Sequence, residues 1–125
     1  MTRQAIEVQN AVAVGPYSHA VDADGFIFLS GQSPVDPQTG KLVEGGIEEQ
    51  TQQCFKNLFC VLDGAGLTQD SVQKVNVYLV DMADFPIMNE VYQRQFSKPY
   101  PARTTIGVAS LPLEAMVEIE MIVKK

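Results

Sequence analysis

The sequence is poor in the side chains that usually bind metals or act as nucleophiles, with one histidine and two cysteines among 125 residues. Because no cluster of Cys, His or Asp at ligand spacing surrounds His19, we expect no metal site. Cys54 and Cys60 fall on different faces of a predicted helix, so both should stay reduced rather than form a disulfide. Cys54 lies on the apolar stripe and should be buried, whereas Cys60 should be partly exposed.

Basic residues and long hydrophobic runs are also scarce. Nine Lys and Arg against fifteen Asp and Glu give a net charge of −6, unlike the basic footprint of a nucleic-acid-binding protein. No stretch approaches the roughly 18 consecutive apolar residues of a membrane span, and the first residues lack the apolar block of a signal peptide. We therefore expect no nucleic-acid partner, no membrane span and a cytoplasmic location. The sequence also has no phosphate-binding glycine loop and no nucleotide fingerprint.

The sequence does contain alternating strand and helix patterns within a length typical of one domain, residues 1–125. Asp24-Gly25 between two apolar runs predicts a β-hairpin, and apolar residues at three- and four-residue spacing predict a long helix. The expected strands are 5–9, 18–22, 26–30, 71–81, 101–108 and 116–123, and the expected helices are 47–65 and 84–96. The order β-β-β-α-β-α-β-β indicates an α+β domain with a mixed sheet.

Turns and helix ends carry their own signals. Gly64 and Gly66 are expected to end the first helix, and Asp84 is the expected N-cap of the second. The segment 36–40 is rich in turn residues and is predicted to be a loop. Because two helices cover only one face of a sheet of this size, the second face is expected to pack against another subunit.

The final two predicted strands combine an arginine with two carboxylates. Side chains alternate along a strand, so Glu118 and Glu120 share one face. Arg103 and Thr105 likewise share a face. We expect these four residues, with Tyr78, to lie on the uncovered face and to line a cleft between subunits. An arginine fork suits a substrate carboxylate, and a nearby glutamate can move protons, which points to an enzyme acting on a small organic acid.

These residues also have ordinary interpretations. Arg103 is equally compatible with a surface ion pair, and the two glutamates are compatible with a solvated strand face. Gly31, at the end of a predicted strand, permits close approach by a ligand or marks a bulge. Tyr17 fits packing as well as it fits a site.

Several short motifs occur together, in one order and at one spacing. They are Gly15-Pro16-Tyr17-Ser18, Leu29-Ser30-Gly31-Gln32, Asp36-Pro37-Gln38-Thr39-Gly40, Pro101-Ala102-Arg103-Thr104 and Val117-Glu118-Ile119-Glu120. As a set they resemble the Rid family, the reactive intermediate deaminases also called YjgF-like proteins, from about Ala5 to the C-terminus. The resemblance implies a chorismate-mutase-like α+β fold and a homotrimer with equivalent clefts between subunits.

The resemblance also implies the activity of a RidA-type 2-iminobutanoate/2-iminopropanoate deaminase. Such an enzyme hydrolyses reactive imino and enamine acids to 2-oxo acids and ammonia without a cofactor, which protects pyridoxal-phosphate enzymes from damage. By position, Arg103 would bind the substrate carboxylate and Glu118 would position or activate water. The residues that would line the cleft are Tyr17, Ser30, Gly31, Asn89 and Thr105. An arginine beside Glu118 would keep that carboxylate ionised.

The sequence departs from the family pattern at some positions, and it is compatible with other functions. Thr105 stands where many family members carry cysteine, so thiol chemistry is not expected there. The connection before Pro101 is shorter than in some members, which leaves the role of Asn89 open. The same cleft would serve a non-catalytic regulatory protein that binds 2-oxo or imino acids. Endoribonuclease or translation-inhibitor activity has been attached to relatives, but the acidic charge and the lack of a histidine-based acid–base pair fit it poorly.

Overall fold

The structure, a computed structural model, describes residues 2–9, 11 and 15–125. Strands and helices alternate as the sequence predicts, with β1 shorter than expected and a small additional pair of strands in the predicted loop. The strands are β1 (Gln4–Ile6), β2 (Ala20–Ala23), β3 (Phe26–Gln32), β4 (Val35–Asp36), β5 (Lys41–Leu42), β6 (Val72–Leu79), β7 (Ala102–Gly107) and β8 (Val117–Lys124). The helices are α1 (Ile47–Gly64) and α2 (Phe85–Gln93), with short 3-10 helices at Gln69–Ser71, Met82–Asp84 and Pro112–Glu114.

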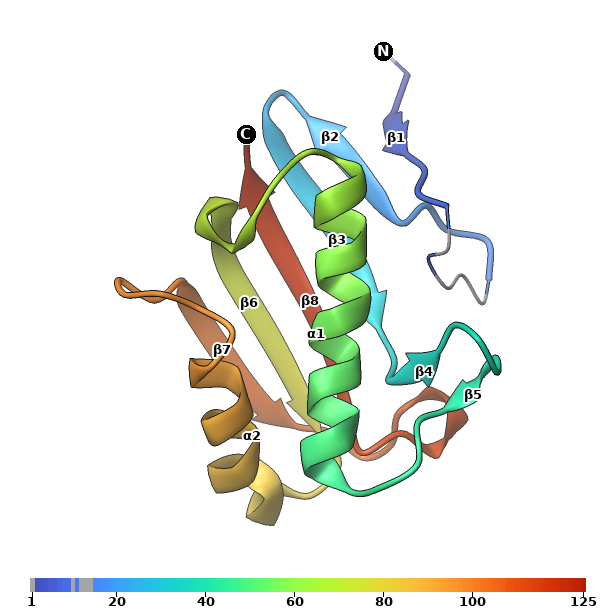
Figure 1. The fold of residues 1–125 in the computed structure, drawn as a ribbon, viewed down its shortest axis with the longest axis vertical. Coiled ribbons are helices and arrows are strands. Elements are labelled where there is room, and N and C mark those ends of the chain that lie inside the picture. Colours follow the sequence, from blue (N-terminus) through green and yellow to red (C-terminus); the bar gives the residue numbers. More distant parts are fainter. Residues whose placement is uncertain (1, 10, 12–14) are drawn as a thin grey trace.

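One mixed sheet organises these elements. Among the described residues its strand order is β1-β2-β3-β8-β6-β7. The strands β6 and β7 run parallel, joined through α2, while the other neighbours are antiparallel. Figure 1 shows α1 and α2 on the same side of this sheet, so the predicted α+β domain with two helices on one face is confirmed.

The hairpin β2–β3 shows how local sequence specifies a turn. Asp24 and Gly25 have φ of 59° and 93°, the two positive values that a type I′ turn requires. The Gly25 N–H donates to Oδ1 of Asp22 at 2.9 Å, which fixes the turn further. Ala23 pairs with Phe26 directly across it. The prediction from Asp24-Gly25 is confirmed.

The core lies between α1 and the sheet. The buried stripe of α1 includes Cys54, Leu58 and Val61, each at most 1% exposed. Both cysteines are free, with Cys54 buried and Cys60 partly exposed, as predicted. The inner face of β8 consists of Val117, Ile119, Met121 and Val123. The strict alternation of β8 therefore sends its two glutamates to the opposite, open face.

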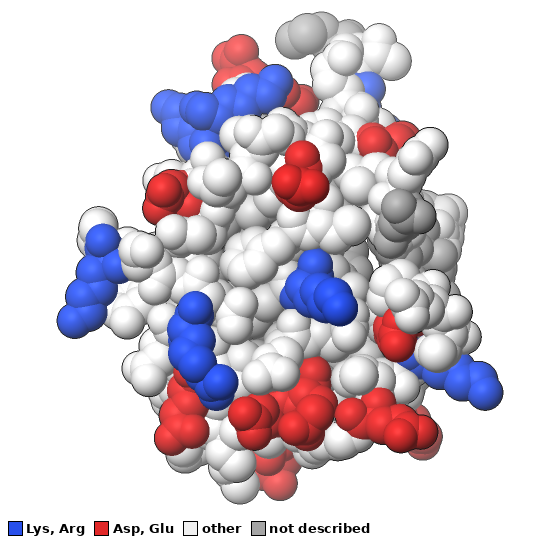
Figure 2. All heavy atoms as spheres, in the orientation of Figure 1, with Lys and Arg blue, Asp and Glu red and all other residues white. Residues whose placement is uncertain are grey.

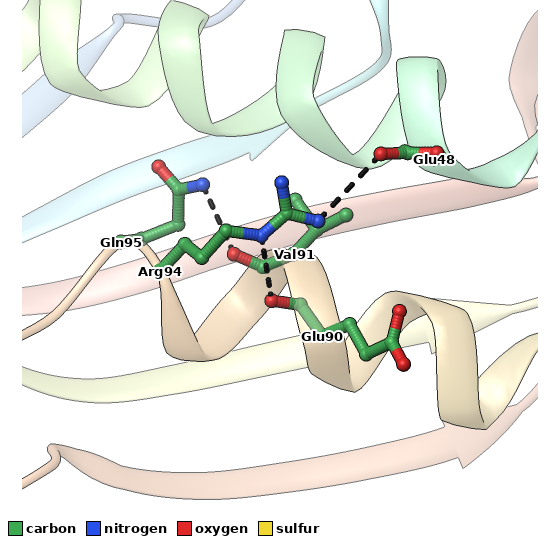
Figure 3. A network of polar contacts seen from close by, with 5 residues as sticks. All are labelled: Glu48, Glu90, Val91, Arg94 and Gln95. Atoms are coloured by element: carbon green, nitrogen blue, oxygen red, sulfur yellow. Dashed lines mark hydrogen bonds and ion pairs between the residues drawn. The ribbon is translucent and has the colours of Figure 1, made fainter.

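Aromatic rings and an ion pair join α2 to α1. The helix α2 ends before Phe96, the predicted boundary, but Phe96 stays buried with its ring centroid 5.8 Å from that of Phe55. Figure 3 shows Arg94, just after α2, reaching Glu48 in the first turn of α1, with 3.6 Å between Nη2 and Oε1. The same guanidinium donates from Nε to the backbone oxygen of Glu90. The buried rings hold α2 against α1, whereas the ion pair is half-exposed and contributes little.

The start of α2 is not capped as predicted. Asp84 has helical backbone angles, and its side chain makes no capping hydrogen bond. A 3-10 turn precedes the helix, and Asp81 caps that turn by accepting the Ala83 N–H at 2.9 Å. Because of this extra turn, the capping residue is Asp81 rather than Asp84. The spacing of apolar residues in α2 does not predict the turn.

The predicted placement of Arg103 and Thr105 on the open face is wrong. The parallel register pairs Val75 with Arg103 and Val77 with Thr105, and residues paired across strands project to the same face. Because Val75 and Val77 are fully buried under the helices, Arg103 and Thr105 lie on the helix side, whereas Glu118 lies on the open side. Alternation tells which residues of one strand share a face, but the register with the next strand decides which face that is.

Candidate functional site

A cavity of about 380 Å³ opens beside Glu118 at the end of β3. Its walls come from the segment before β2, the end of β3, β4 and the 3-10 helix Pro112–Glu114. We call it the Glu118 cavity, and its lining includes Tyr17, Ser30, Gly31, Ser33, Leu113 and Glu118. The structure thus brings three of the predicted cleft residues to the predicted catalytic glutamate.

Glu118 packs against Gly31, in the space that a side chain at position 31 would occupy. The register of β3 against β8 shifts between Leu29 and Gln32, which marks a bulge. A Cβ on Gly31 would lie 2.7 Å from Oε2 of Glu118, closer than atoms can approach without displacement. The strand is therefore bulged here, and the group that approaches the glycine closely is a carboxylate of the chain itself.

Glu118 is half-buried, and its surroundings favour the protonated form. Burial raises the pKa of its carboxyl, the hydrogen bond from Ser33 Oγ at 3.4 Å lowers it, and the charge of Glu120 raises it. Arg103 of the same chain is not among the charges that set this pKa. The prediction that an arginine keeps Glu118 ionised concerns a cleft between subunits and stays a prediction. A cavity carboxyl with a raised pKa is suited to accept and return a proton.

Glu120, in contrast, belongs to a polar network on the open face. The Tyr78 hydroxyl donates to its Oε1 at 2.9 Å, and the Asn76 amide donates to its Oε2 at 3.4 Å. Burial and this carboxylate raise the pKa of Tyr78. Tyr78 lies on the open face as predicted, and Glu120 serves as the acceptor that fixes it. Glu118 is the carboxylate of the pair that lines the cavity.

Arg103 lies in a second, shallower space on the helix side. This Arg103 hollow measures about 300 Å³ and is lined by residues of α2 and of the segment that leads into β7. Nη1 of Arg103 donates to Oδ1 of Asn89 at 2.7 Å. The guanidinium carbon lies 4.6 Å from the ring centroid of Tyr92 and 5.5 Å from that of Phe85, within the range of cation–π attraction. The guanidinium is therefore held in a defined orientation.

These contacts decide two questions that the sequence left open. Asn89 positions Arg103, and the ion pairs found among the described residues do not include Arg103, which argues against an ordinary surface ion pair. Thr105 shares the face of Arg103, and its buried Oγ1 has no hydrogen-bond partner in the described part of the chain. The sequence did not predict that Tyr92 and Phe85 contact Arg103, because aromatic residues on the apolar stripe of a helix are typical of the core.

The predicted site residues thus divide into two groups. Tyr17, Ser30 and Gly31 surround Glu118, whereas Asn89 contacts Arg103 and Thr105 lies on its face of the sheet. Neither the Glu118 cavity nor the Arg103 hollow is lined by both Arg103 and Glu118. One chain therefore presents the carboxyl and the guanidinium in separate places.

Cys54 and His19 line neither the Glu118 cavity nor the Arg103 hollow. Cys54 Sγ donates to the backbone oxygen of Gln32 at 3.2 Å, and burial raises the pKa of its thiol well above the usual range. His19 is buried, with Nδ1 3.6 Å from Oε2 of Glu7, and lines neither space. Within residues 2–9, 11 and 15–125, no three His, Cys, Asp or Glu side chains gather as metal ligands would.

Charged side chains are unevenly distributed over the helix-covered face. Figure 2 shows one small group of basic side chains near the C-terminus and other basic side chains standing apart, with acidic ones gathered at the end where α1 begins. This face offers no broad basic patch to a nucleic acid. In the described part of the chain, no helix has the length and apolar character needed to cross a membrane.

Comparison with known sequences finds one family. The sequence model of the family described as Endoribonuclease L-PSP matches residues 8–125. A RutC family protein of Pyrococcus horikoshii is 44% identical over 124 residues, which cover 98% of each chain. A 2-iminobutanoate/2-iminopropanoate deaminase of Mus musculus is 46% identical over 110 residues, covering 88% of this chain and 82% of that protein.

Solved structures show the same fold. RidA from an Antarctic Psychrobacter superposes with a TM-score of 0.93 at 42% identity, covering 98% of this chain and 100% of that one. TdcF of E. coli, crystallised with bound serine, gives a TM-score of 0.91 at 36% identity and 98% coverage of both chains. The likeness thus extends over nearly the whole length of each chain.

Proposed function

This chain belongs to the Rid (YjgF-like) family, and from that premise we propose that it hydrolyses 2-imino acids to 2-oxo acids and ammonia. The observation that carries the proposal is the oriented Arg103, whose guanidinium faces an open hollow with Asn89 and Tyr92 fixing it. A guanidinium held in this way matches a substrate carboxylate. Relatives of similar identity are named as such deaminases, and TdcF binds serine, which carries the same carboxylate.

The proposed site requires more than one chain, because Arg103 and Glu118 lie on opposite faces of the sheet. We propose a homotrimer of chorismate-mutase-like subunits in which the Arg103 hollow of one subunit meets the Glu118 cavity of the next. The open face supports this assembly, since it exposes large apolar side chains: Phe26 and Phe28 of β3 and Ile106 of β7, which are 44–48% exposed. Burial of such a face is a common reason for subunit association.

The reaction follows from the two groups. Arg103 binds the carboxylate of the 2-imino acid and orients its C2, which is electrophilic once the imine nitrogen is protonated. Glu118 accepts a proton from water as the oxygen attacks C2, which forms a carbinolamine. The glutamate then returns that proton to nitrogen. The C–N bond breaks while the hydroxyl proton passes through Glu118 to the departing ammonia, which leaves the 2-oxo acid and ammonium. The raised pKa of Glu118 suits this exchange, because a pKa closer to neutral pH favours both taking up and releasing a proton.

The proposed substrates are 2-iminobutanoate and 2-iminopropanoate, the imines of the enamines that pyridoxal-phosphate dehydratases release from threonine and serine. Removing them in the cytoplasm would protect enzymes that the enamines attack. Hydrolysis needs only water, so no cofactor enters the scheme. RNA cleavage, the activity in the family's description, fits less well, because the chain carries a net charge of −6 and its one histidine lines neither space.

The test couples threonine dehydratase to this protein and follows the release of 2-oxobutanoate. We expect the wild type to accelerate release and Arg103→Ala to lose about 10²-fold or more of that effect, because the substrate loses its anchor. Arg94→Ala is the matched control, since Arg94 is also an arginine near α2 but is half-exposed and pairs with Glu48. Unchanged release with the wild type would sink the proposal, and binding of 2-oxo acids without turnover would favour a regulatory protein.

A further inference from the structure

The lining of the Glu118 cavity includes apolar residues that have no role in the chemistry above. Its polar part includes Ser30, Ser33 and Glu118, and its apolar part consists of Val35, Pro112 and Leu113. Ligand pockets commonly combine a few polar groups that fix orientation with apolar walls that accept hydrocarbon. Water transfer at C2 uses only the polar part, so the apolar part is available to another portion of the substrate.

Leu113, which lines this cavity, has an uncommon backbone conformation. It has φ of 62° and ψ of 16°, and Glu114 follows with φ of 60°. Consecutive residues with side chains in the left-handed region are uncommon and persist only where the surrounding structure holds them. In this conformation Leu113 stays 51% exposed, so burial in the core does not explain why a leucine stands here.

The segment that carries Leu113 is anchored on its C-terminal side. The Met116 N–H donates to Oε1 of Gln50 at 2.8 Å, and the Met116 carbonyl accepts the Val80 N–H at 3.2 Å. The Ala115 N–H closes the turn on the backbone oxygen of Pro112 at 3.2 Å. These bonds tie the turn to α1 and to the end of β6. The position of Leu113 at the cavity rim is therefore set by the scaffold.

We propose that Leu113, with Val35 and Pro112, forms a subsite for the aliphatic side chain of the substrate and determines which 2-imino acids this chain prefers. This inference rests on the proposed function. The preferred substrates are 2-imino acids with branched or extended aliphatic side chains, such as the imine of leucine, over 2-iminopropanoate. Burying each additional methylene against an apolar wall is expected to improve kcat/KM about fourfold.

The experiment compares two imines in wild type and two variants. An amino-acid oxidase generates the imines of L-leucine and L-alanine in place, and semicarbazide competes for them, so kcat/KM is read from the loss of semicarbazone. We expect the wild type to favour the leucine imine and Leu113→Ala to lower the leucine-to-alanine ratio about tenfold. Leu113→Gly should lower it equally while fitting the left-handed backbone without strain, which separates loss of the side chain from damage to the turn.

Binding of the matching 2-oxo acids, 4-methyl-2-oxopentanoate and 2-oxopropanoate, gives a second readout that does not depend on turnover. A wild type that hydrolyses neither imine overturns the proposed function, but the subsite still stands if Leu113→Ala reduces the binding preference between the two acids. Turnover of both imines with ratios that neither variant changes overturns the subsite and leaves the proposed function intact. Leu113→Met, which keeps volume and apolar character, should retain the preference.

Discussion

The Glu118 cavity and the Arg103 hollow hold their charged groups by different means. The cavity places a carboxylate against a glycine, half out of water, with one hydroxyl donating to it. The hollow places a guanidinium on aromatic faces, with one amide oxygen accepting from it. The first arrangement raises the pKa of the carboxyl that it holds, and the second fixes the orientation of a guanidinium. The difference matches the two roles proposed above, proton exchange for Glu118 and anion binding for Arg103.

The two regions also sit on opposite sides of the same sheet. Within one chain, Arg103 therefore does not counteract the effect of burial on Glu118. If the hollow of a neighbouring subunit meets the cavity, the two charges approach only in the assembled site. Chains that each lack either Arg103 or Glu118 can test whether the two groups meet between subunits.

The largest effect is expected from mixing two inactive variants. Arg103→Ala retains the Glu118 cavity, and Glu118→Gln retains the Arg103 hollow. Refolded together in equal amounts, they should recover about a quarter of wild-type activity, because a heterologous interface joins both intact halves in about one case in four. The measurement is 2-oxobutanoate release in the coupled assay. Each variant refolded alone is the control, and a mixture no more active than the variants would mean that the halves do not meet across an interface.

A smaller effect is expected when the carboxylate is displaced without being removed. In Gly31→Ala the new Cβ would lie 2.7 Å from Oε2 of Glu118, so the carboxylate has to move. A shift of about 1 Å at a reacting group can cost on the order of 10²-fold in rate, and we expect kcat to fall about 10- to 100-fold.

Gly46→Ala is the control for this substitution, because a Cβ there would meet only Oε1 of Glu49 at 4.0 Å. The Arg103 hollow should be unaffected in Gly31→Ala, so binding of a 2-oxo acid should weaken less than turnover. Full activity in Gly31→Ala would contradict the close packing of Glu118 against the bulge.

The smallest effect concerns stability and pH. Because the folded protein raises the pKa of Glu118 above its unfolded value, this group stabilises the fold fully below the unfolded pKa and loses that contribution as pH rises through the folded pKa. Glu118→Gln stays uncharged, so at pH 7 it should melt on the order of 1 °C above wild type, a small gain because solvent screens a half-exposed group.

Thermal melts between pH 4 and pH 7 test this expectation. The advantage of Glu118→Gln should shrink toward pH 4, where the wild-type carboxyl is protonated. Glu90→Gln, which changes an exposed glutamate of α2, is the matched control for the loss of one carboxylate. A lower melting temperature for Glu118→Gln at pH 7 would mean that the cavity favours the charged carboxylate.

Much of the fold could be predicted because local chemistry specifies it. Asp24-Gly25 fits only a narrow class of turn, the stripe of α1 repeats over several turns, and the alternation of β8 continues along its whole length. The two-residue strands β4 and β5 escaped prediction because they are too short to show a period. The Asp81 cap was missed because a 3-10 turn ahead of α2 leaves no clear pattern.

Only part of the candidate site could be predicted from the sequence. The grouping of Tyr17, Ser30 and Gly31 with Glu118 agrees with the resemblance to the family. The face that Arg103 occupies could not be predicted from one strand, since it depends on how β7 aligns with β6. The aromatic support of Arg103 was hidden for a related reason, because Tyr92 contributes to the core and to the hollow at once.

The position of β7 at the edge of the sheet has a consequence for how this protein tolerates change. An edge strand carries backbone N–H and C=O groups that point away from its one neighbour. A ligand resting against this edge would be recognised by atoms that every residue possesses, so the contact would survive substitutions of the side chains around it. Recognition through the backbone would make an exchange of the Thr105 side chain harmless to that contact. Sequence drift along β7 would then be limited mainly by Arg103, which binds the substrate in the proposed site, and by Ile106, which packs at the proposed interface.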